Sequence, residues 1–338
     1  MNSVDADFRP APARPEARGR HSTFAALDLG TNNCRLLVAT PAPGGFRVVD
    51  AFSRIVRLGE GMGASGVLSE AAMERTIDAL KVCAAKIRRQ GVIRARTVAT
   101  EACRRAGNCQ DFVERARAAT GLTLEIISSG EEARLSLAGC APLLDASHPW
   151  ALVFDIGGGS TELSWARHVD GRTDVIDCVS LPLGVVTLGE RFSHGANGVD
   201  AYTDMVAEVD ARLAPFDSRH GIASVVEQGS VQMLGSSGTV TTLAGVHLDL
   251  PRYDRSRVDG YRLAFAAVEE VTRRLAGMPV VERERHPCIG RERADLVLAG
   301  CAILEAICRR WPVGTVRVAD RGVREGILLA LMAEAGRA

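Results

Sequence analysis

The chain has 338 residues, of which 46% are hydrophobic and 24% are charged, and its 41 basic and 41 acidic side chains give a net charge of zero. This length is enough for two domains of ordinary size, and the composition is typical of a soluble globular protein. The charge balance argues against a protein that binds nucleic acid over its whole surface. The longest apolar runs are too short to span a bilayer, so we expect no membrane partner.

The N-terminus and the cysteines indicate the compartment. Residues 1–21 are polar and rich in Pro, Ala and Arg, without the apolar region of a secretory signal, so we expect them to form a disordered extension. The nine cysteines form no CxxC pair. Several lie in apolar segments, where a reduced cysteine behaves as a small hydrophobe. This usage predicts a cytoplasmic protein without a zinc site.

The first segment after this extension predicts a hairpin. Residues Phe24 to Ala39, FAALDLGTNNCRLLVA, have the pattern of a strand, a glycine turn and a second strand. The elements expected after it are a strand over Phe46–Arg57, a helix over Ser69–Arg89 with Ser69 as its N-cap, a strand over Thr97–Thr100, a helix over Asp111–Thr120 that ends at Gly121, and a strand over Leu122–Ile127.

A helix is predicted from Glu131 to about Gly139, and Glu132 near its start has two candidate roles. Ser129 and Glu132 have the S-x-x-E spacing of a capping box, in which Glu132 would only stabilise the helix N-terminus. Glu132 also lies at a strand-to-helix corner, where a carboxylate can act as a general base on water. The two roles need different side-chain directions, so only one can dominate.

Residues Ala151 to Ala166, ALVFDIGGGSTELSWA, repeat the plan of the first hairpin around three glycines. The residues after the glycines alternate, whereas a Rossmann or Walker loop continues into a helix. Glycine lets successive backbone N–H groups converge on an oxyanion such as phosphate. Asp155 and Glu162 add the carboxylates that a magnesium phosphate site needs. The alternative is an ordinary glycine-rich hairpin.

Two hairpins with one plan predict a duplicated domain. When Asp28 is aligned with Asp155, Thr31 and Asn32 fall at the turn and Leu36 corresponds to Leu163. Two facing copies would clamp one phosphorylated ligand in the cleft between them.

The second half of the chain continues the alternation of strands and helices. The last predicted helix should cross back onto the first domain. Several arginines could line a path for a polyanion, although most of them fit solvated faces better: Arg252, Arg255, Arg283, Arg285, Arg291 and Arg293. The expected strands are Thr173–Pro182, Gln232–Gly235 and Val316–Val318, and the expected helices are Asp200–Ala214, Thr239–Val246 with Ser237 or Thr239 as its cap, Leu263–Leu275, Asp295–Arg309 and Gly326–Glu334.

Seven segments taken in order resemble the motifs of the exopolyphosphatase/guanosine pentaphosphate phosphatase (Ppx/GppA) family. They are ALDLGTNNCRLLVA, VATEACRRA, IISSGEEARLSLAG, VFDIGGGSTELS, SLPLGVVTLGERF, LGSSGTVTTLAG and DRGVREGIL, and they extend over about Phe24 to Leu329. The resemblance implies an α/β fold of two actin-like, ribonuclease-H-type domains of the ASKHA superfamily with an active site in the cleft between them. The first domain would span residues 22–130 and receive the C-terminal helix at about 323–336, and the second would span residues 131–322.

Carried over residue by residue, the resemblance assigns a role to each motif. Glu132 would be the catalytic base, Arg104 of the T-x-A-x-R motif would hold phosphate, and Asp155 and Glu162 would serve Mg²⁺ or Mn²⁺ and the attacking water. The family usually has serine at the position of Asn33. The first phosphate loop would be Asp28, Gly30, Thr31, Asn32 and Asn33, the second would be Gly157, Gly158, Gly159, Ser160 and Thr161, and Gly238 and Thr239 would approach the far phosphates.

The implied reaction is hydrolysis of the terminal phosphoanhydride bond of inorganic polyphosphate, with guanosine pentaphosphate (pppGpp) as the second substrate. The chain resembles the short two-domain members, and a homodimer without a specific nucleic-acid partner is expected from them. Two other classes stay open. An actin-like ATPase or kinase would need a fuller adenosine loop than SSGTVTT, and a sensor would bind guanosine tetra- or pentaphosphate without turnover.

Overall fold

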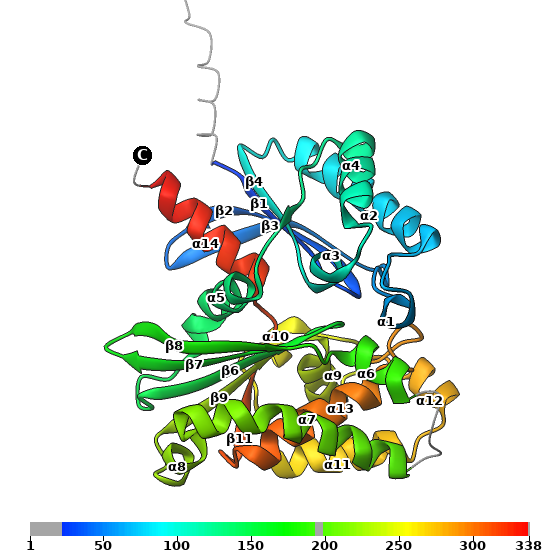
Figure 1. Ribbon diagram of the computed structural model, residues 1–338. Coiled ribbons are helices and arrows are strands. Elements are labelled where there is room, and N and C mark those ends of the chain that lie inside the picture. The colour runs from blue at the N-terminus through cyan, green and yellow to red at the C-terminus, as the bar shows by residue number, and fades with distance from the viewer. Residues whose placement is uncertain (1–21, 193–198, 337–338) are drawn as a thin grey trace, which may run out of the picture.

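The computed structural model describes residues 22–192 and 199–336, and the extension expected over residues 1–21 lies outside them. The described residues form two mixed sheets (Figure 1), the first with strand order β3-β2-β1-β4-β5 and the second with β10-β11-β9-β6-β7-β8. The strands of the first sheet are β1 (Phe24–Leu29), β2 (Asn33–Ala42), β3 (Gly45–Ile55), β4 (Arg94–Ala99) and β5 (Glu125–Ile126). Those of the second are β6 (Trp150–Ile156), β7 (Thr161–Val169), β8 (Arg172–Leu181), β9 (Val231–Ser236), β10 (Arg262–Ala264) and β11 (Thr315–Ala319).

Helices cover both faces of each sheet (Figure 1). Helices α2 and α4 lie on the outer face of the first sheet, α7, α9 and α13 lie on the outer side of the second, and α5 and α14 lie between the two sheets. No helix in these residues is long and apolar enough to cross a membrane. The first-domain helices are α1 (Met62–Ser65), α2 (Glu70–Arg89), α3 (Glu101–Arg105) and α4 (Cys109–Thr120). The others are α5 (Ser129–Cys140), η1 (Ala141–Leu143), α6 (Val185–Phe192), α7 (Val199–His220), α8 (Ile222–Glu227), α9 (Gly238–His247), α10 (Arg255–Val258), α11 (Phe265–Ala276), α12 (Val280–Arg285), α13 (Val297–Arg310) and α14 (Val323–Ala335).

The two sheets share one plan, as the repeated hairpins predicted. Strand β1 runs antiparallel to β2 and parallel to β4, and β6 has the same relation to β7 and β9. Asp28 and Asp155 occupy equivalent positions in the two hairpins. The residue opposite Asp28 is Arg35, whereas the residue opposite Asp155 is Glu162. The duplicated hairpins therefore present opposite charges at one equivalent position.

Most predicted elements are present, and the exceptions have local causes. Ser69 caps α2 as predicted, by accepting a hydrogen bond from the amide of Ala72. The segment Leu263–Leu275, predicted as one helix, begins as β10 because Leu263 pairs with Val316 of β11. Helix α3 was not predicted, since a single turn carries too little periodicity to be read from a sequence.

Helices α5 and α14 cross between the sheets at glycines. Helix α14 packs on β1 and β2, as predicted for a helix that crosses back, and α5 packs on β7 and β8. A Cβ atom at Gly139 would lie 2.1 Å from the carbonyl oxygen of Gly322, and one at Gly326 would lie 2.0 Å from that of Leu135. Because these neighbours are backbone atoms, no side chain fits unless the helices separate. The glycines therefore set the distance between the domains.

The domains also meet on the opposite side, near α1 and α6 (Figure 1). The amide of Gly61 donates to Oε1 of Glu190 at 2.9 Å. The guanidinium of Arg57 donates to Oδ1 of Asp295 and to the carbonyl of Glu292, both at 3.1 Å. Contacts thus border the interdomain cleft at both edges.

Replacing Gly326 with alanine tests the helix crossing. The added Cβ meets the backbone of Leu135, so we expect the free energy of unfolding to fall by about 1–3 kcal/mol despite the better helix propensity of alanine. Urea-induced unfolding measures this loss. The control is Gly336→Ala, just beyond the same helix, where the nearest atom is 3.5 Å away. The control should change stability by less than about 0.5 kcal/mol, and equal losses in the two variants would contradict the close crossing.

Candidate active site

The two hairpin turns end at a small cavity of about 110 Å³ between the domains. Its wall contains most of the residues that the sequence predicted for the site. Arg104 and Thr161 are not part of that wall. The predicted residues that line it are Asp28, Gly30, Thr31, Asn32, Asn33, Glu132, Asp155, Gly157, Gly158, Gly159, Ser160, Glu162, Gly238 and Thr239.

Each turn is closed by an equivalent backbone hydrogen bond. The amide of Gly30 donates to the carbonyl of Asn33, and the amide of Gly157 donates to that of Ser160, each at 2.9 Å. The carbonyls of Gly157 and Gly158 accept from the first amides of α6 at 3.0 and 2.8 Å. The carbonyls of the glycine turn therefore face α6. In this arrangement, backbone amides of the glycine turn can face an anion.

The tips of the two turns touch each other. A Cβ at Gly158 would lie 3.0 Å from Cβ of Asn32, and one at Gly159 would lie 2.6 Å from Oγ1 of Thr31. The glycines are thus needed for contact between the domains as well as for the shape of the turn.

The first turn contains buried polar atoms without a protein partner. Among the described residues, Oγ1 of Thr31 and the side-chain oxygens of Asn32 and Asn33 make no hydrogen bond although they are buried. An unsatisfied buried polar group costs about 1–3 kcal/mol, and such groups are rare in native proteins. Three of them in one turn beside a cavity indicate that the turn binds a polar ligand or water.

The N-terminus of α9 also faces the cavity. Ser237 caps this helix, as one of the two predicted caps, and its Oγ accepts from the amides of Thr239 and Val240. Gly238 and Thr239 line the cavity in the first turn of the helix. The positive end of the helix dipole therefore lies where an anionic group would bind.

Glu162 is held by two serine hydroxyls in a buried setting. Ser160 and Ser180 donate to its Oε1 at 2.7 and 2.8 Å. Burial raises the pKa of Glu162 to about 7, the two hydroxyl bonds oppose this, and the charge of Asp155 adds to it. Burial also raises the pKa values of Asp155 and Asp28, against the charge of Arg35. Several carboxyl groups are thus buried near one another, and a cation bound there would stabilise their charged forms.

Glu132 faces the cavity, and its predicted capping box is wrong. The N-cap of α5 is Ser128, whose Oγ accepts from the amide of Glu131 at 3.2 Å. Glu131 turns toward Arg96 in an ion pair of 2.5 Å. Glu132 accepts a hydrogen bond from Nη1 of Arg104 at 2.7 Å. Burial raises the pKa of Glu132 well above its ordinary value, the charge of Glu162 adds to this, and Arg104 opposes it.

Two predicted site residues lie behind the cavity wall. Arg104 donates to Glu132, to Oε2 of Glu101 and to the carbonyl of Ile127. The hydroxyl of Thr161 donates to the carbonyl of Leu183 at 2.7 Å, and the residue is 1% exposed. Thr161 thus connects the turn end of the hairpin to the segment before α6.

A larger cavity of about 450 Å³ adjoins the small one and shares Asp28, Arg35, Asp155 and Arg293 with it. Arg324 lines it too, with a side chain 14% exposed and 4.0 Å from the carboxylate of Glu325. Burial lowers the pKa values of Arg293 and Arg324. Because buried guanidinium groups normally pair with anions, these arginines indicate an anion site.

The predicted polyanion path is only partly present. Arg293 lines both cavities and Arg291 lines a third beside them. Arg283 is buried and donates to the carbonyls of Met278 and Ala294, so it supports the fold. The wall of the two main cavities includes Arg255 but neither Arg252 nor Arg285. Arg35 and Arg324 also line the larger cavity but were not among the predicted site residues, although the position of Arg35 opposite Asp28 in the hairpin was a usable signal.

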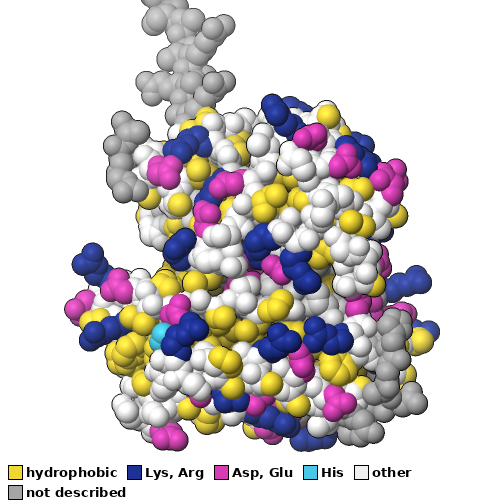
Figure 2. Space-filling model, in the orientation of Figure 1, with side chains coloured by type: hydrophobic (Ala, Val, Ile, Leu, Met, Phe, Trp, Pro, Cys, Tyr) yellow, Lys and Arg dark blue, Asp and Glu magenta, His cyan; other side chains and the backbone are white. Residues whose placement is uncertain are grey.

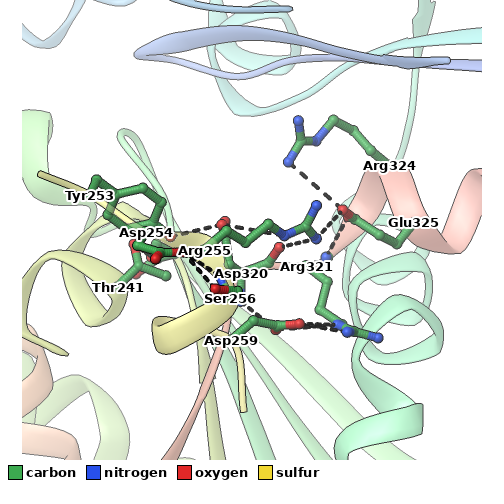
Figure 3. A network of polar contacts seen from close by, with 12 residues as sticks. Thr241, Tyr253, Asp254, Arg255, Ser256, Asp259, Asp320, Arg321, Arg324 and Glu325 are labelled. Atoms are coloured by element: carbon green, nitrogen blue, oxygen red, sulfur yellow. Dashed lines mark hydrogen bonds and ion pairs between the residues drawn. The ribbon is translucent and has the colours of Figure 1, made fainter. Parts of the chain in front are cut away.

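A polar network holds the start of α14, from which Arg324 extends toward the first sheet (Figure 3). The carboxylate of Glu325 accepts from the amide of Gly322 at 2.8 Å and from Arg255 at 3.2 Å. Asp259 pairs with Arg321 through Nε at 2.9 Å. These contacts join residues of the second domain to the helix that covers the first sheet. Basic side chains also gather at the surface along the boundary between the domains (Figure 2).

The donor set fits a cation that is shared with the substrate. In the part of the chain that the structure describes, no group of three His, Cys, Asp or Glu side chains could hold a metal by itself. Mg²⁺ is usually bound through one or two carboxylates, with water and substrate phosphates as the other ligands. Asp155 and Glu162, with unpartnered amide oxygens across the cavity, match that requirement.

Comparisons with known proteins support the fold and identify a family. The sequence profile of the Ppx/GppA phosphatase family matches residues 37–335. "Exopolyphosphatase 2" of Mycobacterium tuberculosis is 31% identical over 320 residues, which cover 91% of this chain and 98% of that protein. The crystal structure of the Aquifex aeolicus Ppx/GppA family member has a TM-score of 0.76 and 28% identity over 94% and 99% of the two chains. An exopolyphosphatase structure from Cytophaga hutchinsonii shares the fold, with a TM-score of 0.83 and 23% identity over 93% and 98% of the two chains. The predicted α/β fold is confirmed, with two mixed sheets and the fold of the Ppx/GppA structures.

Thr31→Val tests whether the unpartnered hydroxyl serves a ligand. Without ligand, the melting temperature should stay equal or rise, because an unpaired buried hydroxyl is removed. With inorganic triphosphate, the rise in melting temperature should be smaller than in wild type. The control is Thr76→Val, whose buried hydroxyl donates to the carbonyl of Ala72 at 2.7 Å. It should lower the melting temperature and keep the full triphosphate shift, and the same behaviour in Thr31→Val would refute the ligand role.

Proposed function

The chain belongs to the Ppx/GppA phosphatase family, and from this we propose that it is an exopolyphosphatase that releases orthophosphate from the end of inorganic polyphosphate. The observation that carries the proposal is the position of Glu132, which faces two glycine turns across one small cavity. The turns and the N-terminus of α9 suit a terminal phosphate group, and Glu132 suits the water that attacks it.

The proposed mechanism is hydrolytic phosphoryl transfer. Backbone amides of the turns and of α9 hold the terminal phosphate, and Thr31 donates its free hydroxyl to a phosphate oxygen. Glu132 accepts a proton from water as the water oxygen bonds to the terminal phosphorus, and the bond to the bridging oxygen breaks. Mg²⁺ or Mn²⁺ bound at Asp155 and Glu162 would offset the phosphate charge. The products are orthophosphate and a chain shortened by one unit.

The arginines of the larger cavity suit the rest of the substrate. Arg35, Arg293 and Arg324 offer guanidinium groups next to the small cavity, so the second and later phosphates would lie there. The same cavity is also lined by the aromatic Tyr253 and the apolar Ile289, and these residues favour pppGpp as the second candidate substrate. A sensor without turnover ranks lower, because it needs no base at the position of Glu132. An actin-like ATPase or kinase ranks lower, because it would need a fuller adenosine loop than SSGTVTT.

Glu132→Gln tests the base. Orthophosphate release from medium-chain polyphosphate and from pppGpp, measured in parallel with Mg²⁺, should fall by about 10²–10⁴-fold. The matched control is Glu131→Gln, which changes the neighbouring carboxylate in the Arg96 ion pair and should stay within about twofold of wild type. Unchanged release by Glu132→Gln would rule out its role as base. No release by the wild-type protein from either substrate would favour the sensor or the kinase. If both substrates release orthophosphate, the one hydrolysed faster decides between an exopolyphosphatase and a guanosine pentaphosphate phosphatase.

Arg293→Gln tests the larger cavity. Loss of one charge-assisted hydrogen bond, worth about 1.5–3 kcal/mol, should raise KM for polyphosphate by about 10–100-fold and leave kcat within about threefold. Steady-state kinetics measure both constants. Arg285→Gln is the control, since Arg285 is exposed and lies outside both cavities. Equal changes in KM for the two variants would assign the effect to overall charge.

A further inference from the structure

Two carboxylates share the guanidinium of Arg104. Oε2 of Glu101 accepts from Nε and Nη2 at 3.1 and 2.9 Å, and Oε2 of Glu132 accepts from Nη1 at 2.7 Å. The second hydrogen of Nη1 points to the carbonyl of Ile127 at 3.0 Å. The side chains of Glu101, Arg104 and Glu132 are 12%, 16% and 14% exposed. Arg104 is therefore almost fully occupied by protein acceptors.

This arrangement leaves little of Arg104 for a phosphate. Glu101 and Glu132 line the small cavity, whereas Arg104 does not. A phosphate in the cavity would meet the two carboxylates before the guanidinium. The cluster of two carboxylates and one guanidinium also has a net negative charge, and this charge opposes binding of an anion at this point.

Glu101 connects the cluster to the glycine turn. A Cβ at Gly159 would lie 3.0 Å from Cγ of Glu101, so this side chain packs directly beneath the turn. Glu101 begins α3, and Arg104 follows one helical turn later on the same face. Glu132 comes from α5, so the three side chains join three segments of the chain at one point.

We propose that Arg104 and Glu101 are positioning residues, in which Glu101 holds the guanidinium and the guanidinium holds the Glu132 carboxylate against the cavity wall. The inference rests on the proposed function, because it gives the catalytic base its support. It replaces the phosphate-binding role that the family resemblance suggested for Arg104. Oε2 of Glu132 is fixed by Arg104, and Oε1 is the oxygen left to accept the proton of water.

The charges around Glu132 indicate a second role for Arg104, which is to oppose the rise in the pKa of Glu132. Glu162 on β7 and Asp28 on β1 face Glu132 with like charge, while Arg104 provides the opposing charge and Glu101 partly offsets it. Burial raises the pKa of Glu132, and Arg104 lowers it. The guanidinium thus opposes protonation of the Glu132 carboxylate, which must be charged to accept a proton in general base catalysis.

A double-mutant cycle separates positioning from phosphate binding. Arg104→Lys keeps the charge but loses the planar fork that bonds two carboxylates. If Arg104 acts through Glu132, Arg104→Lys should lower kcat by about 10-fold or more with KM within about twofold. In the Glu132→Gln background the same substitution should lower the residual rate by less than about threefold. Equal losses in both backgrounds, with a raised KM, would overturn the proposal.

Glu101→Gln is the second variant, and it tests the same proposal if Arg104→Lys fails to fold. Its carbonyl oxygen can still accept from Arg104 but lacks the charge, so kcat should fall by about 3–10-fold without a change in KM. That loss should disappear in the Glu132→Gln background. Arg96→Lys is the matched control. Arg96 pairs with Glu131, the residue next to Glu132, and neither Arg96 nor Glu131 lines the small cavity. It should leave kcat and KM within about twofold, and losses equal to those of Arg104→Lys would contradict the positioning role.

Binding of inorganic triphosphate tests the role of Arg104 independently of the proposed function. The dissociation constant for triphosphate, measured by calorimetry on wild type and on Arg104→Lys, should agree within about twofold. A weakening of tenfold or more would make Arg104 a phosphate ligand and overturn the inference. If wild type shows no hydrolysis of polyphosphate or pppGpp, the proposed function fails, and the triphosphate comparison still decides whether Arg104 contacts phosphate.

Discussion

Backbone contact between α5 and α14 holds the two domains at the separation on which the site depends. Gly139 and Gly326 leave no room for a Cβ between these helices. At this separation the tips of the two hairpin turns touch, through Gly158 and Gly159 on one side and Thr31 and Asn32 on the other. A side chain at any of these glycines would displace backbone or the opposite turn. Close approach of glycine backbones thus shapes both the crossing of α5 and α14 and the cavity.

Within this geometry, burial decides the chemistry of the cavity. The carboxyl groups of Asp28, Asp155, Glu132 and Glu162 have raised pKa values because burial disfavours their charges. The arginines on the other side have lowered pKa values for the same reason. Such an arrangement is costly for the empty protein and becomes favourable when a cation and a polyanion bind together. The arrangement therefore suits the binding of a charged ligand.

The recognition groups divide between two neighbouring cavities. Backbone amides, the free hydroxyl of Thr31 and the α9 N-terminus surround the small one. Guanidinium groups line the larger one, and the network around Glu325 fixes the helix that carries Arg324. This division suits a substrate whose terminal group needs orientation while the remainder needs charge neutralisation. Arg104 lies behind Glu132, outside the wall of the small cavity.

The sequence by itself determined the local features: the two hairpins, their duplication, the cap at Ser69, the glycines of the turns and most strands and helices. These depend on alternation, spacing and backbone freedom within short segments. The direction of Glu132 was undecided because its S-x-x-E spacing with Ser129 fitted a cap and its place at a strand-to-helix corner fitted a base. Only the structure shows that Ser128 is the N-cap and that Glu132 lines the cavity. The partners of Arg104 and the meeting of Arg35, Arg293 and Arg324 were likewise decided by tertiary structure. Contacts between segments far apart in the chain depend on how sheets and helices pack, and no local pattern encodes them.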